Sequence, residues 1–197
     1  MHKIVALCGT SRPNNMTEKA LRVVCQSLMD KGFEVDLFLA EDMNLNFPGQ
    51  APSEDSQRMT EAVKDSIAVV IATPEYHGTF AAMTKLMIEN MGFPSALSGK
   101  PVAMLGVAAG RIGAIKSLEQ LKGVVSHVGA IAVPGAVSIA GVNQAFDESG
   151  KCTDVGSENA LQGLAGQIEN FVKDYVCPKL SLESQVREKC DAWSTSV

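Results

Sequence analysis

Residues 3–24 read KIVALC-GTSRPNN-MTEKALRVV, and the spacing of the apolar residues changes within this stretch. Residues 3–8 form a nearly unbroken apolar run, which is typical of a strand buried on both faces of a parallel sheet. From Met16 onward the apolar residues recur at helical spacing, and Asn15 with Glu18 has the spacing of a capping box. The stretch therefore predicts a buried strand, a polar loop and a helix.

The alternation of strand and helix continues along the chain. Further strands are predicted at 33–39, 67–72, 102–107 and 130–133, and further helices at 54–64, 80–91, 115–125 and 161–175. The strand at 33–39 alternates apolar and polar residues, which places it at an edge of the sheet. Strands that alternate with helices form a parallel sheet covered on both faces, so we predict an α/β three-layer sandwich with five parallel strands.

We predict one domain over residues 1–178 and a polar tail over residues 179–197. A chain of 197 residues is long enough to fold as one domain without a disulfide or a metal. The tail contains the only tryptophan, Trp193, and has two interpretations. It is either a weakly helical extension, as chain ends often are, or an arm that packs on a second subunit.

Composition excludes several classes of protein. The net charge of −5 and the mean hydropathy of +0.09 are typical of a globular chain. Aromatic residues make up only 5%, which argues against a base-stacking surface, and the acidic balance argues against binding to nucleic-acid phosphates. No apolar run approaches the roughly 20 residues of a membrane span, so we expect a cytoplasmic protein with no membrane span.

The cysteines and histidines form no recognisable metal or nucleophile motif. The five cysteines are widely spaced without a CxxC pair, and we interpret them as free thiols, with the first two in the core: Cys8, Cys25, Cys152, Cys177 and Cys190. The three histidines fit no metal-binding pattern, and no GxSxG motif occurs. We therefore predict neither a metal site nor hydrolytic machinery.

In open α/β sheets a ligand binds beyond the carboxyl ends of the strands, so the loops after the predicted strands are the candidate site. The first loop, residues 9–17, reads GTSRPNNMT and combines hydroxyl and amide side chains with Arg12 at a helix start. Free N–H groups, hydroxyls and an arginine together form a phosphate-binding site. One glycine does not make a dinucleotide fingerprint, and the P-loop ending is missing. An ordinary polar loop is the alternative.

The second loop, residues 73–79, reads TPEYHGT, in which Pro74 fixes its own φ and Gly78 permits a positive φ. We predict a rigid turn whose backbone groups and Tyr76 meet a flat heterocycle. His77 taken alone is more typical of a surface or packing histidine. Thr79 is predicted to be the N-cap of the following helix.

The third loop, residues 106–113, reads GVAAGRIG, and its small residues leave room for an aromatic ring system. A tight turn that needs glycine for backbone reasons explains the same residues. Arg111 has two interpretations, contact with an anionic part of a ligand or a salt bridge between subunits. A phosphate site and a flat slot without hydrolytic residues indicate that a cofactor carries the chemistry.

At these loops the sequence resembles the NADPH-dependent FMN reductase family of flavodoxin-like proteins, which includes chromate, quinone and azo-dye reductases. GTSR at 9–12 with NMT at 15–17 is similar to the family's loop for the FMN phosphate, and PEYH at 74–77 is similar to its loop at the flavin ring. LSGKPVA at 97–103 looks like the family's entry into the fourth strand. The resemblance implies FMN as cofactor and the flavodoxin-like strand order 2-1-3-4-5.

Carried over position by position, the resemblance implies one set of residues around the FMN phosphate and another beside the flavin ring. The phosphate set is Thr10, Ser11, Arg12, Asn15, Met16 and Thr17, and the ring set is Pro74, Glu75, Tyr76 and His77 on one side with Ala109, Gly110 and Arg111 on the other. No residue receives a catalytic role, because the flavin N5 carries the hydride. The chain departs from the family at Ala81-Ala82 and Asn90, where proline-glycine and tryptophan are common, and at His77, where asparagine is usual.

The resemblance implies an oxidoreductase that takes hydride from NADPH or NADH and passes it through FMN to a quinone, an azo compound, a metal oxyanion or free flavin. The alternative is a non-catalytic FMN carrier or a flavin-sensing protein, and the modest charge of −5 favours the enzyme. The family also implies a homodimer or homotetramer. Phe80, Met83, Met87 and Met91 have the spacing of such an interface, although core packing explains the same stripe.

Overall fold

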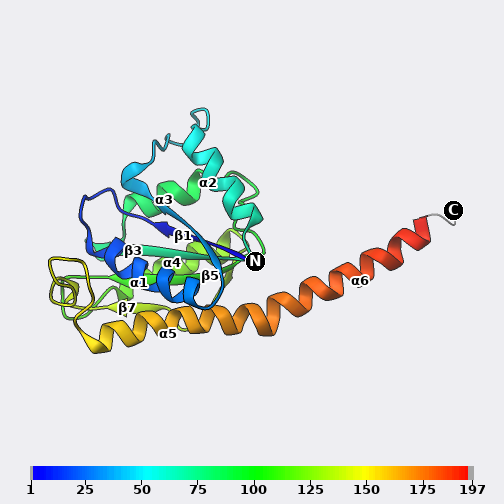
Figure 1. Ribbon diagram of the computed structural model, residues 1–197. Coiled ribbons are helices and arrows are strands. Elements are labelled where there is room, and N and C mark those ends of the chain that lie inside the picture. The colour runs from blue at the N-terminus through cyan, green and yellow to red at the C-terminus, as the bar shows by residue number, and fades with distance from the viewer. Residues whose placement is uncertain (1, 195–197) are drawn as a thin grey trace.

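The computed structural model describes the backbone of residues 2–194 and the side chains of residues 2–188. A sheet forms the middle layer, with helices on both faces (Figure 1). Its strands are β1 (Lys3–Cys8), β2 (Glu34–Leu39), β3 (Ala68–Tyr76), β4 (Thr79–Phe80), β5 (Pro101–Val107), β6 (Ile131–Ala132) and β7 (Val137–Ile139). The order across the sheet is β2-β1-β3-β5-β6, while β7 also pairs with β5 and β4 pairs with β3.

Helices α1 and α5 cover one face of the sheet, and α2, α3 and α4 cover the other. The helices are α1 (Met16–Asp30), α2 (Glu54–Asp65), α3 (Ala82–Glu89), α4 (Ile115–His127), α5 (Val155–Phe171) and α6 (Cys177–Ser194), with short helical turns η1 (Ala40–Asp42) and η2 (Val142–Gln144) and the π-helical turn η3 (Val172–Val176). The predicted three-layer α/β fold is confirmed. Within residues 2–194, no helix is both long enough and apolar enough to cross a membrane.

The predicted strand order is also confirmed, with one difference at an edge. The fifth position holds two short strands, because β6 pairs with the start of β5 and β7 pairs with its end. Pro134 lies between them and has no N–H to donate to the sheet, and the following Gly135 has a φ of 85°. The strand predicted for an edge, β2, occupies the opposite edge.

The side chains of β1 alternate between two cores, which explains its nearly unbroken apolar run. Ile4, Ala6 and Cys8 pack on the side of α1 and α5. Val5 and Leu7 pack on the side of α2, α3 and α4. Since all five side chains are buried, neither face of this strand tolerates polar residues.

Two expectations about core residues are met. Cys25 of α1 is buried like Cys8, so both predicted core cysteines are confirmed. Met87 of α3 and Met91 just after it are buried in the core between the sheet and the helices α2, α3 and α4. Phe80 and Met83 pack against that core. Core packing therefore accounts for the spacing of this apolar stripe.

The third strand is longer than predicted, and this changes the start of the next helix. β3 continues to Tyr76 and then folds back as β4, so Tyr76 pairs with Thr79 across a two-residue turn. The prediction that Thr79 caps the next helix is therefore wrong. Helix α3 begins at Ala82, and its N-cap residue Ala81 makes no side-chain cap bond.

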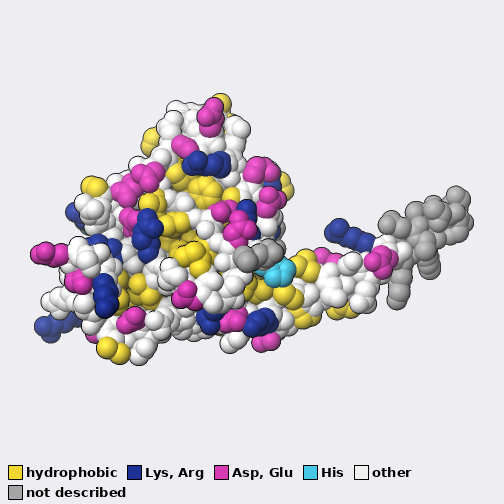
Figure 2. Space-filling view, in the orientation of Figure 1, with side chains coloured by type: hydrophobic (Ala, Val, Ile, Leu, Met, Phe, Trp, Pro, Cys, Tyr) yellow, Lys and Arg dark blue, Asp and Glu magenta, His cyan; other side chains and the backbone are white. Residues whose placement is uncertain are grey.

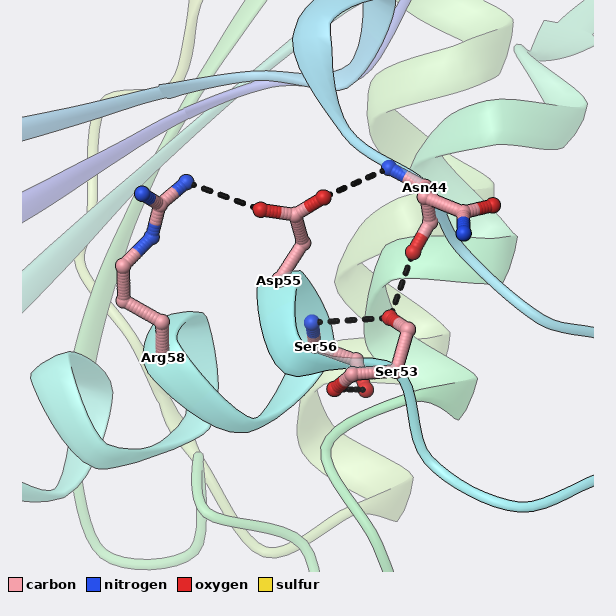
Figure 3. A network of polar contacts seen from close by, with 5 residues as sticks. All are labelled: Asn44, Ser53, Asp55, Ser56 and Arg58. Carbon is pink, nitrogen blue, oxygen red and sulfur yellow. Dashed lines mark hydrogen bonds and ion pairs between the residues drawn. The ribbon is translucent and has the colours of Figure 1, made fainter.

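A polar network fixes the loop between η1 and α2 to the start of α2 (Figure 3). The Ser53 hydroxyl caps α2 by accepting the Ser56 N–H at 3.1 Å and donates to the Asn44 carbonyl. The Asp55 carboxylate accepts the Asn44 N–H at 2.9 Å and an Arg58 N–H at 3.1 Å. The helix predicted at 54–64 thus begins after the side-chain cap Ser53. Bonds from Ser53 and Asp55 to Asn44 attach the preceding loop to the start of this helix.

Helices α5, η3 and α6 form one continuous rod, and α6 extends away from the body of the protein (Figure 1). The helix predicted at 161–175 starts earlier, at Val155, because the Asp154 side chain accepts the Ser157 N–H at 2.7 Å and caps it. The tail predicted from residue 179 is helical to Ser194. The side chains of Cys190 and Trp193 lie outside the described residues.

Candidate functional site

A cleft of about 410 Å³ lies at the carboxyl ends of β1, β3 and β5. Three loops and η2 form its walls, and the lining residues are Arg12, Pro13, Asn14, Asn15, Met16, Thr17, Pro74, Glu75, Tyr76, Val107, Ala108, Ala109, Val142 and Asn143. The volume is in the range of small-molecule sites. This end of a parallel sheet is also where open α/β folds bind their ligands.

Asn15 organises the first wall of the cleft, which is the start of α1. Its Oδ1 accepts the Glu18 N–H at 2.7 Å, and its Nδ2 donates to the Arg12 carbonyl at 2.8 Å. The predicted cap of α1 is therefore present. The carboxylate of Glu18 does not close a capping box, because it pairs with Arg22 at 2.7 Å. One asparagine thus holds both the helix start and the loop that leads into it.

The first wall offers unpaired hydrogen-bond donors. Among the described residues, no acceptor is bonded to the N–H groups of Met16 and Thr17, which lie at the positive end of the helix dipole. The exposed side chain of Arg12 adds a cation. Thr10 is buried and its Oγ1 accepts the Arg12 N–H at 3.4 Å, so it supports the loop without lining the cleft. This wall is therefore suited to an anion.

Buried hydroxyl groups join the first loop to β3 and α3. The Thr84 hydroxyl donates to the Gly9 carbonyl at 3.0 Å, and its oxygen lies 2.9 Å from that of Thr73. Thr73 Oγ1 also accepts the Ala81 N–H at 3.1 Å. Gly9 packs so closely here that a Cβ would lie 2.0 Å from Thr84 Oγ1. Sequence reasoning did not identify Thr84, whose contacts with Gly9 and Thr73 exist only in the folded chain.

The second wall is the hairpin of β3 and β4. Its turn residues His77 and Gly78 both have positive φ, 51° and 76°, as in the two-residue turns that asparagine and glycine favour. Gln120 of α4 holds the turn: its Nε2 donates to the Gly78 carbonyl at 3.1 Å, and its Oε1 accepts the Thr79 hydroxyl at 2.5 Å. The turn is therefore rigid, as predicted. His77 itself is exposed and lies outside the cleft.

Glu75 lines the cleft, but its carboxylate is directed to α4. Glu75 Oε2 accepts the Ser117 N–H at 3.1 Å, in the first turn of that helix. The N-cap residue Ala114 provides no side-chain bond, so Glu75 serves as the cap from a distant part of the chain. A carboxylate at this position also offsets the positive end of the helix dipole. Glu75 therefore joins the hairpin to α4.

Arg12 and Tyr76 come from different loops and meet beside the cleft. The guanidinium carbon lies 5.9 Å from the centre of the tyrosine ring, which is within the range of a cation–π contact. The cation predicted for one end of the ligand and the aromatic ring predicted for the other are thus neighbours. Together they link the first and second walls on the solvent side.

The third wall is the loop after β5. Ala108 donates its N–H to the Ile139 carbonyl at 2.9 Å, and its own carbonyl accepts the Val142 N–H at 3.1 Å. These bonds bring η2 against the loop, so Val142 and Asn143 join Ala108 and Ala109 in the lining. The wall offers small apolar side chains and leaves room for a flat group.

The structure brings most of the predicted site residues together. Those that line the cleft are Arg12, Asn15, Met16, Thr17, Pro74, Glu75, Tyr76 and Ala109. Those that lie outside its lining are Thr10, Ser11, His77, Gly110 and Arg111. Val142 and Asn143 were not foreseen, because nothing in their own sequence marks them and only the pairing of β7 with β5 brings them there.

Cys8 lies directly beneath the first wall. Burial raises the pKa of its thiol to about 12, and nearby Glu18 adds to the effect. Its Sγ donates to Asn15 Oδ1 at 3.7 Å. A thiol in this state is not a nucleophile near neutral pH, so the sulfur has a packing role.

Two positions that depart from the family pattern have structural roles away from the cleft. Asn90 Nδ2 donates to the carbonyls of Asn46 and Leu86, both at 2.9 Å, and so ties the loop before α2 to α3. Ala81 is buried and bonds to Thr73. Neither Ala81 nor Asn90 lines the cleft, so these two departures do not change the residues of its walls.

Comparison with known proteins places these loops in context. A model of the family described as NADPH-dependent FMN reductase matches residues 2–144, a range that includes every residue lining the cleft. An NADPH azoreductase of Bacillus sp. (strain OY1-2) is 32% identical over 156 residues, covering 76% of this chain and 83% of the relative. A quinone reductase of Pseudomonas putida is 28% identical over 183 residues, covering 88% of this chain and 96% of the relative.

A solved structure shares the fold over most of its length. The flavoenzyme NAD(P)H:(acceptor) oxidoreductase FerB of Paracoccus denitrificans aligns with a TM-score of 0.72 at 25% identity. The alignment covers 89% of this chain and 99% of that structure. The chain therefore shares its fold with a flavoenzyme of known structure.

Proposed function

The chain belongs to the NADPH-dependent FMN reductase family, and from this we propose that its cleft holds FMN and serves hydride transfer from a nicotinamide to a quinone or an azo compound. Membership makes the protein an NAD(P)H-dependent oxidoreductase with FMN as cofactor. The proposal concerns which residues hold the cofactor and what accepts the electrons. Three features of the cleft support it.

The first feature is the donor set at the start of α1. The N–H groups of Met16 and Thr17, the hydroxyl-bearing side chain of Thr17 and the guanidinium of Arg12 line one end of the cleft. Charge-assisted bonds from such groups suit a terminal phosphate, which carries close to two negative charges. We assign this end to the FMN phosphate.

The second feature is the pair of walls that would face the flavin ring. On one side stand Pro74, Glu75 and Tyr76 at the end of β3, and on the other stand Ala108 and Ala109. Short side chains let the backbone approach a flat ring, and the tied hairpin keeps the opposite wall in place. The fit of the residues to FMN rests on this combination of an anion site and a flat slot.

The third feature is the small number of ionisable groups. The ionisable side chains among the lining residues are Arg12, Glu75 and Tyr76, and the carboxylate of Glu75 already accepts the Ser117 N–H. When bound, FMN supplies the redox chemistry, since it exchanges a hydride with a nicotinamide. The protein's task is then to bind and orient, and solvent supplies the protons through the open side of the cleft.

Quinones and azo compounds are the proposed acceptors for two reasons. The names of the relatives indicate these classes, and both classes are flat molecules. The loop of the third wall presents the short side chains of Ala108 and Ala109 to the slot, which leaves room for a flat acceptor. Metal oxyanions are less well matched to this wall, because none of its lining residues carries a positive charge.

The observation that carries the proposal is the juxtaposition of the α1 donor set with the flat slot in one cleft. The test uses the purified protein loaded with FMN and follows the oxidation of NADPH and of NADH in separate assays with a benzoquinone, an azo dye or buffer alone. We expect oxidation to depend on FMN and to be faster with either acceptor than without. FMN bound without turnover would contradict the proposed function and identify a carrier or sensor instead.

A further inference from the structure

The chain that follows the third wall of the cleft carries two exposed apolar side chains. Ile112 and Ile115 are 79% and 49% exposed. Ile112 comes shortly after Ala109, which lines the cleft, and Ile115 is the first residue of α4. Core packing does not account for these two side chains. Apolar side chains next to a ligand site are suited to contact with an apolar part of a ligand.

Hydrogen bonds hold the segment that carries these side chains. The Gly110 carbonyl accepts the N–H groups of Gly113 at 3.3 Å and of Gly141 at 3.1 Å. The Ala114 N–H donates to Ser138 Oγ at 2.8 Å. Both ends of the segment are thus bonded to the chain in and after β7, so the turn between them is fixed.

Two cations flank the isoleucines, and we call Arg111, Ile112, Ile115 and Lys116 the rim. Arg111 and Lys116 are both exposed. Among the described residues, neither cation forms an ion pair. Lys116 also lies beside the hairpin turn of the second wall, because its Cδ is 3.8 Å from the position of a Cβ added to Gly78. The rim therefore spans the gap between the second and third walls.

Acidic residues are scarce around the rim, although Figure 2 shows basic and acidic side chains mixed at the end of the body opposite α6. Residues 101–118 contain no Asp or Glu, and neither do residues 133–146, which surround β7. Two carboxylates do lie close by: Glu75 accepts the Ser117 N–H, and Glu119 follows in α4. Neither is ion-paired with a rim cation, so both cations are available to an anion.

The FMN assigned to the cleft does not require these cations. FMN has a single phosphate, which we assign to Arg12 and the donor set of α1. A further pair of unpaired cations beyond the third wall therefore indicates a second anionic ligand. Because the nicotinamide must reach the flavin ring, the hydride donor is a ligand of this kind.

We propose that the rim binds the adenosine 2′-phosphate end of NADPH, so that the protein prefers NADPH to NADH. This inference rests on the proposed function. The two donors differ only in this phosphate, which carries close to two negative charges. It is also the phosphate nearest to the adenine base, so a flat apolar face and an anion lie side by side. Ile112 and Ile115 suit the base, and Arg111 and Lys116 suit the phosphate.

The first test measures binding without turnover. NADP⁺ and NAD⁺ do not reduce FMN, and each is titrated into the FMN-loaded protein by calorimetry. We expect the wild type to bind NADP⁺ about tenfold more tightly than NAD⁺, because each exposed cation contributes about threefold. Arg111→Ala and Lys116→Ala should each weaken NADP⁺ binding about threefold and leave NAD⁺ binding unchanged.

Three further variants separate the charge from the apolar contact. Lys122→Ala is the matched control, because Lys122 is an exposed cation of α4 outside the rim. It should bind both dinucleotides like the wild type. Arg111→Lys keeps the charge and should retain most of the preference. Ile112→Ala removes an apolar contact with the base that both dinucleotides share, so it should weaken NADP⁺ and NAD⁺ to the same extent.

The second test follows hydride transfer. The FMN-loaded wild type and variants are assayed with a benzoquinone and with either NADPH or NADH. In Arg111→Ala and Lys116→Ala, kcat/KM for NADPH should fall by the same factors as the affinity for NADP⁺. For NADH, kcat/KM should stay near the wild-type value.

Equal affinity of the wild type for NADP⁺ and NAD⁺ would overturn the proposal, as would a loss of the preference in Lys122→Ala. If Arg111→Ala and Lys116→Ala weaken both dinucleotides alike, the rim contacts the pyrophosphate that both share and the proposed preference is wrong. A protein that binds FMN but oxidises neither donor would overturn the proposed function. The calorimetric comparison would then still decide the inference about the rim.

Discussion

The first and second walls of the cleft are built in different ways. Asn15 and Thr10 hold the first wall through bonds that span two or three residues of sequence. The second wall depends on bonds from Glu75 to Ser117 and from Thr79 to Gln120, which span 42 and 41 residues. The helix start at the anion-binding end is thus held by local bonds, and Thr84 adds one distant bond to Gly9 at the base of its loop, whereas the opposite end exists only once α4 has packed.

Because of this difference, we expect the first wall to contribute mainly to ligand affinity and the second wall mainly to the placement of the groups around the ligand. The first wall keeps its donors as long as α1 is a helix, so its contribution to ligand affinity depends on few residues. The second wall places its groups through the tertiary fold, so its precision depends on the stability of α4 and the hairpin. Changes to the two walls should therefore affect different measurements.

The largest effect is expected at Gly9, where the two walls are joined. In Gly9→Ala the added Cβ would lie 2.0 Å from Thr84 Oγ1 and 2.9 Å from the Thr84 backbone, so the first loop must move away from α3. We expect the free energy of unfolding in urea to fall by about 3 kcal/mol. Gly110→Ala is the control, because a Cβ added at Gly110 would point into open space, with no atom beyond its chain neighbours within 4 Å. Equal losses for both variants would refute the role of Gly9.

Next in size is the effect of Arg12→Ala, which tests the first wall alone. Removal of one charge-assisted bond should weaken FMN binding by about 2 kcal/mol, or roughly 30-fold, and leave the unfolding midpoint of the FMN-free protein nearly unchanged. The measurement is a fluorescence titration of flavin. Arg22→Ala removes a cation of helix α1 that lies outside the cleft and should bind FMN like the wild type. Similar weakening in both variants would point to general electrostatics.

A smaller effect is expected at Glu75, which tests the second wall. Glu75→Ala leaves the first turn of α4 without its cap and should reduce the free energy of unfolding by about 1 kcal/mol. Glu75→Gln keeps an acceptor oxygen but loses the charge, so its loss should be about half as large. Thermal unfolding of the FMN-free variants provides both values. Identical stability of all three proteins would show that the bond to Ser117 contributes nothing.

The smallest effect is expected at His77, and it is stabilising. His77 has a φ of 51°, a conformation that asparagine adopts at lower cost. His77→Asn should raise the free energy of unfolding by about 0.5 kcal/mol. His77→Ala removes the imidazole without easing the backbone, so it should bring no gain. If alanine stabilises as much as asparagine, the side chain and not the turn is responsible.

The comparison of the walls also explains what the sequence could predict. The buried strand, the cap at Asn15 and the strand-loop-helix alternation depend on residues close in sequence, and all of them are present. Thr79 was misassigned because a hydroxyl residue before an apolar helical pattern is a genuine cap signal. Here two residues of positive φ fold the chain back first, so Thr79 pairs with Tyr76.

Features of the site that depend on tertiary packing have no recognisable signal in the sequence around them. Thr84 and Gln120 look like ordinary helix residues, yet one joins two loops and the other holds the hairpin turn. Val142 and Asn143 reach the cleft only because β7 pairs with β5. Gly110, expected on the ring side, is exposed and does not line the cleft. The roles of such residues can be assigned only when the three-dimensional contacts are known.

The burial of Cys8 has a consequence for damage by oxidants. Peroxide attacks the thiolate form of cysteine, and both exposure and a low pKa favour the attack. Burial raises the pKa of Cys8 and of Cys25 to about 12, so both sulfurs remain protonated and shielded. Of the four cysteines whose side chains are described, Cys177 is the one that is not buried. Oxidation should therefore begin at Cys177, the first residue of α6, before it reaches Cys8 beneath the cleft.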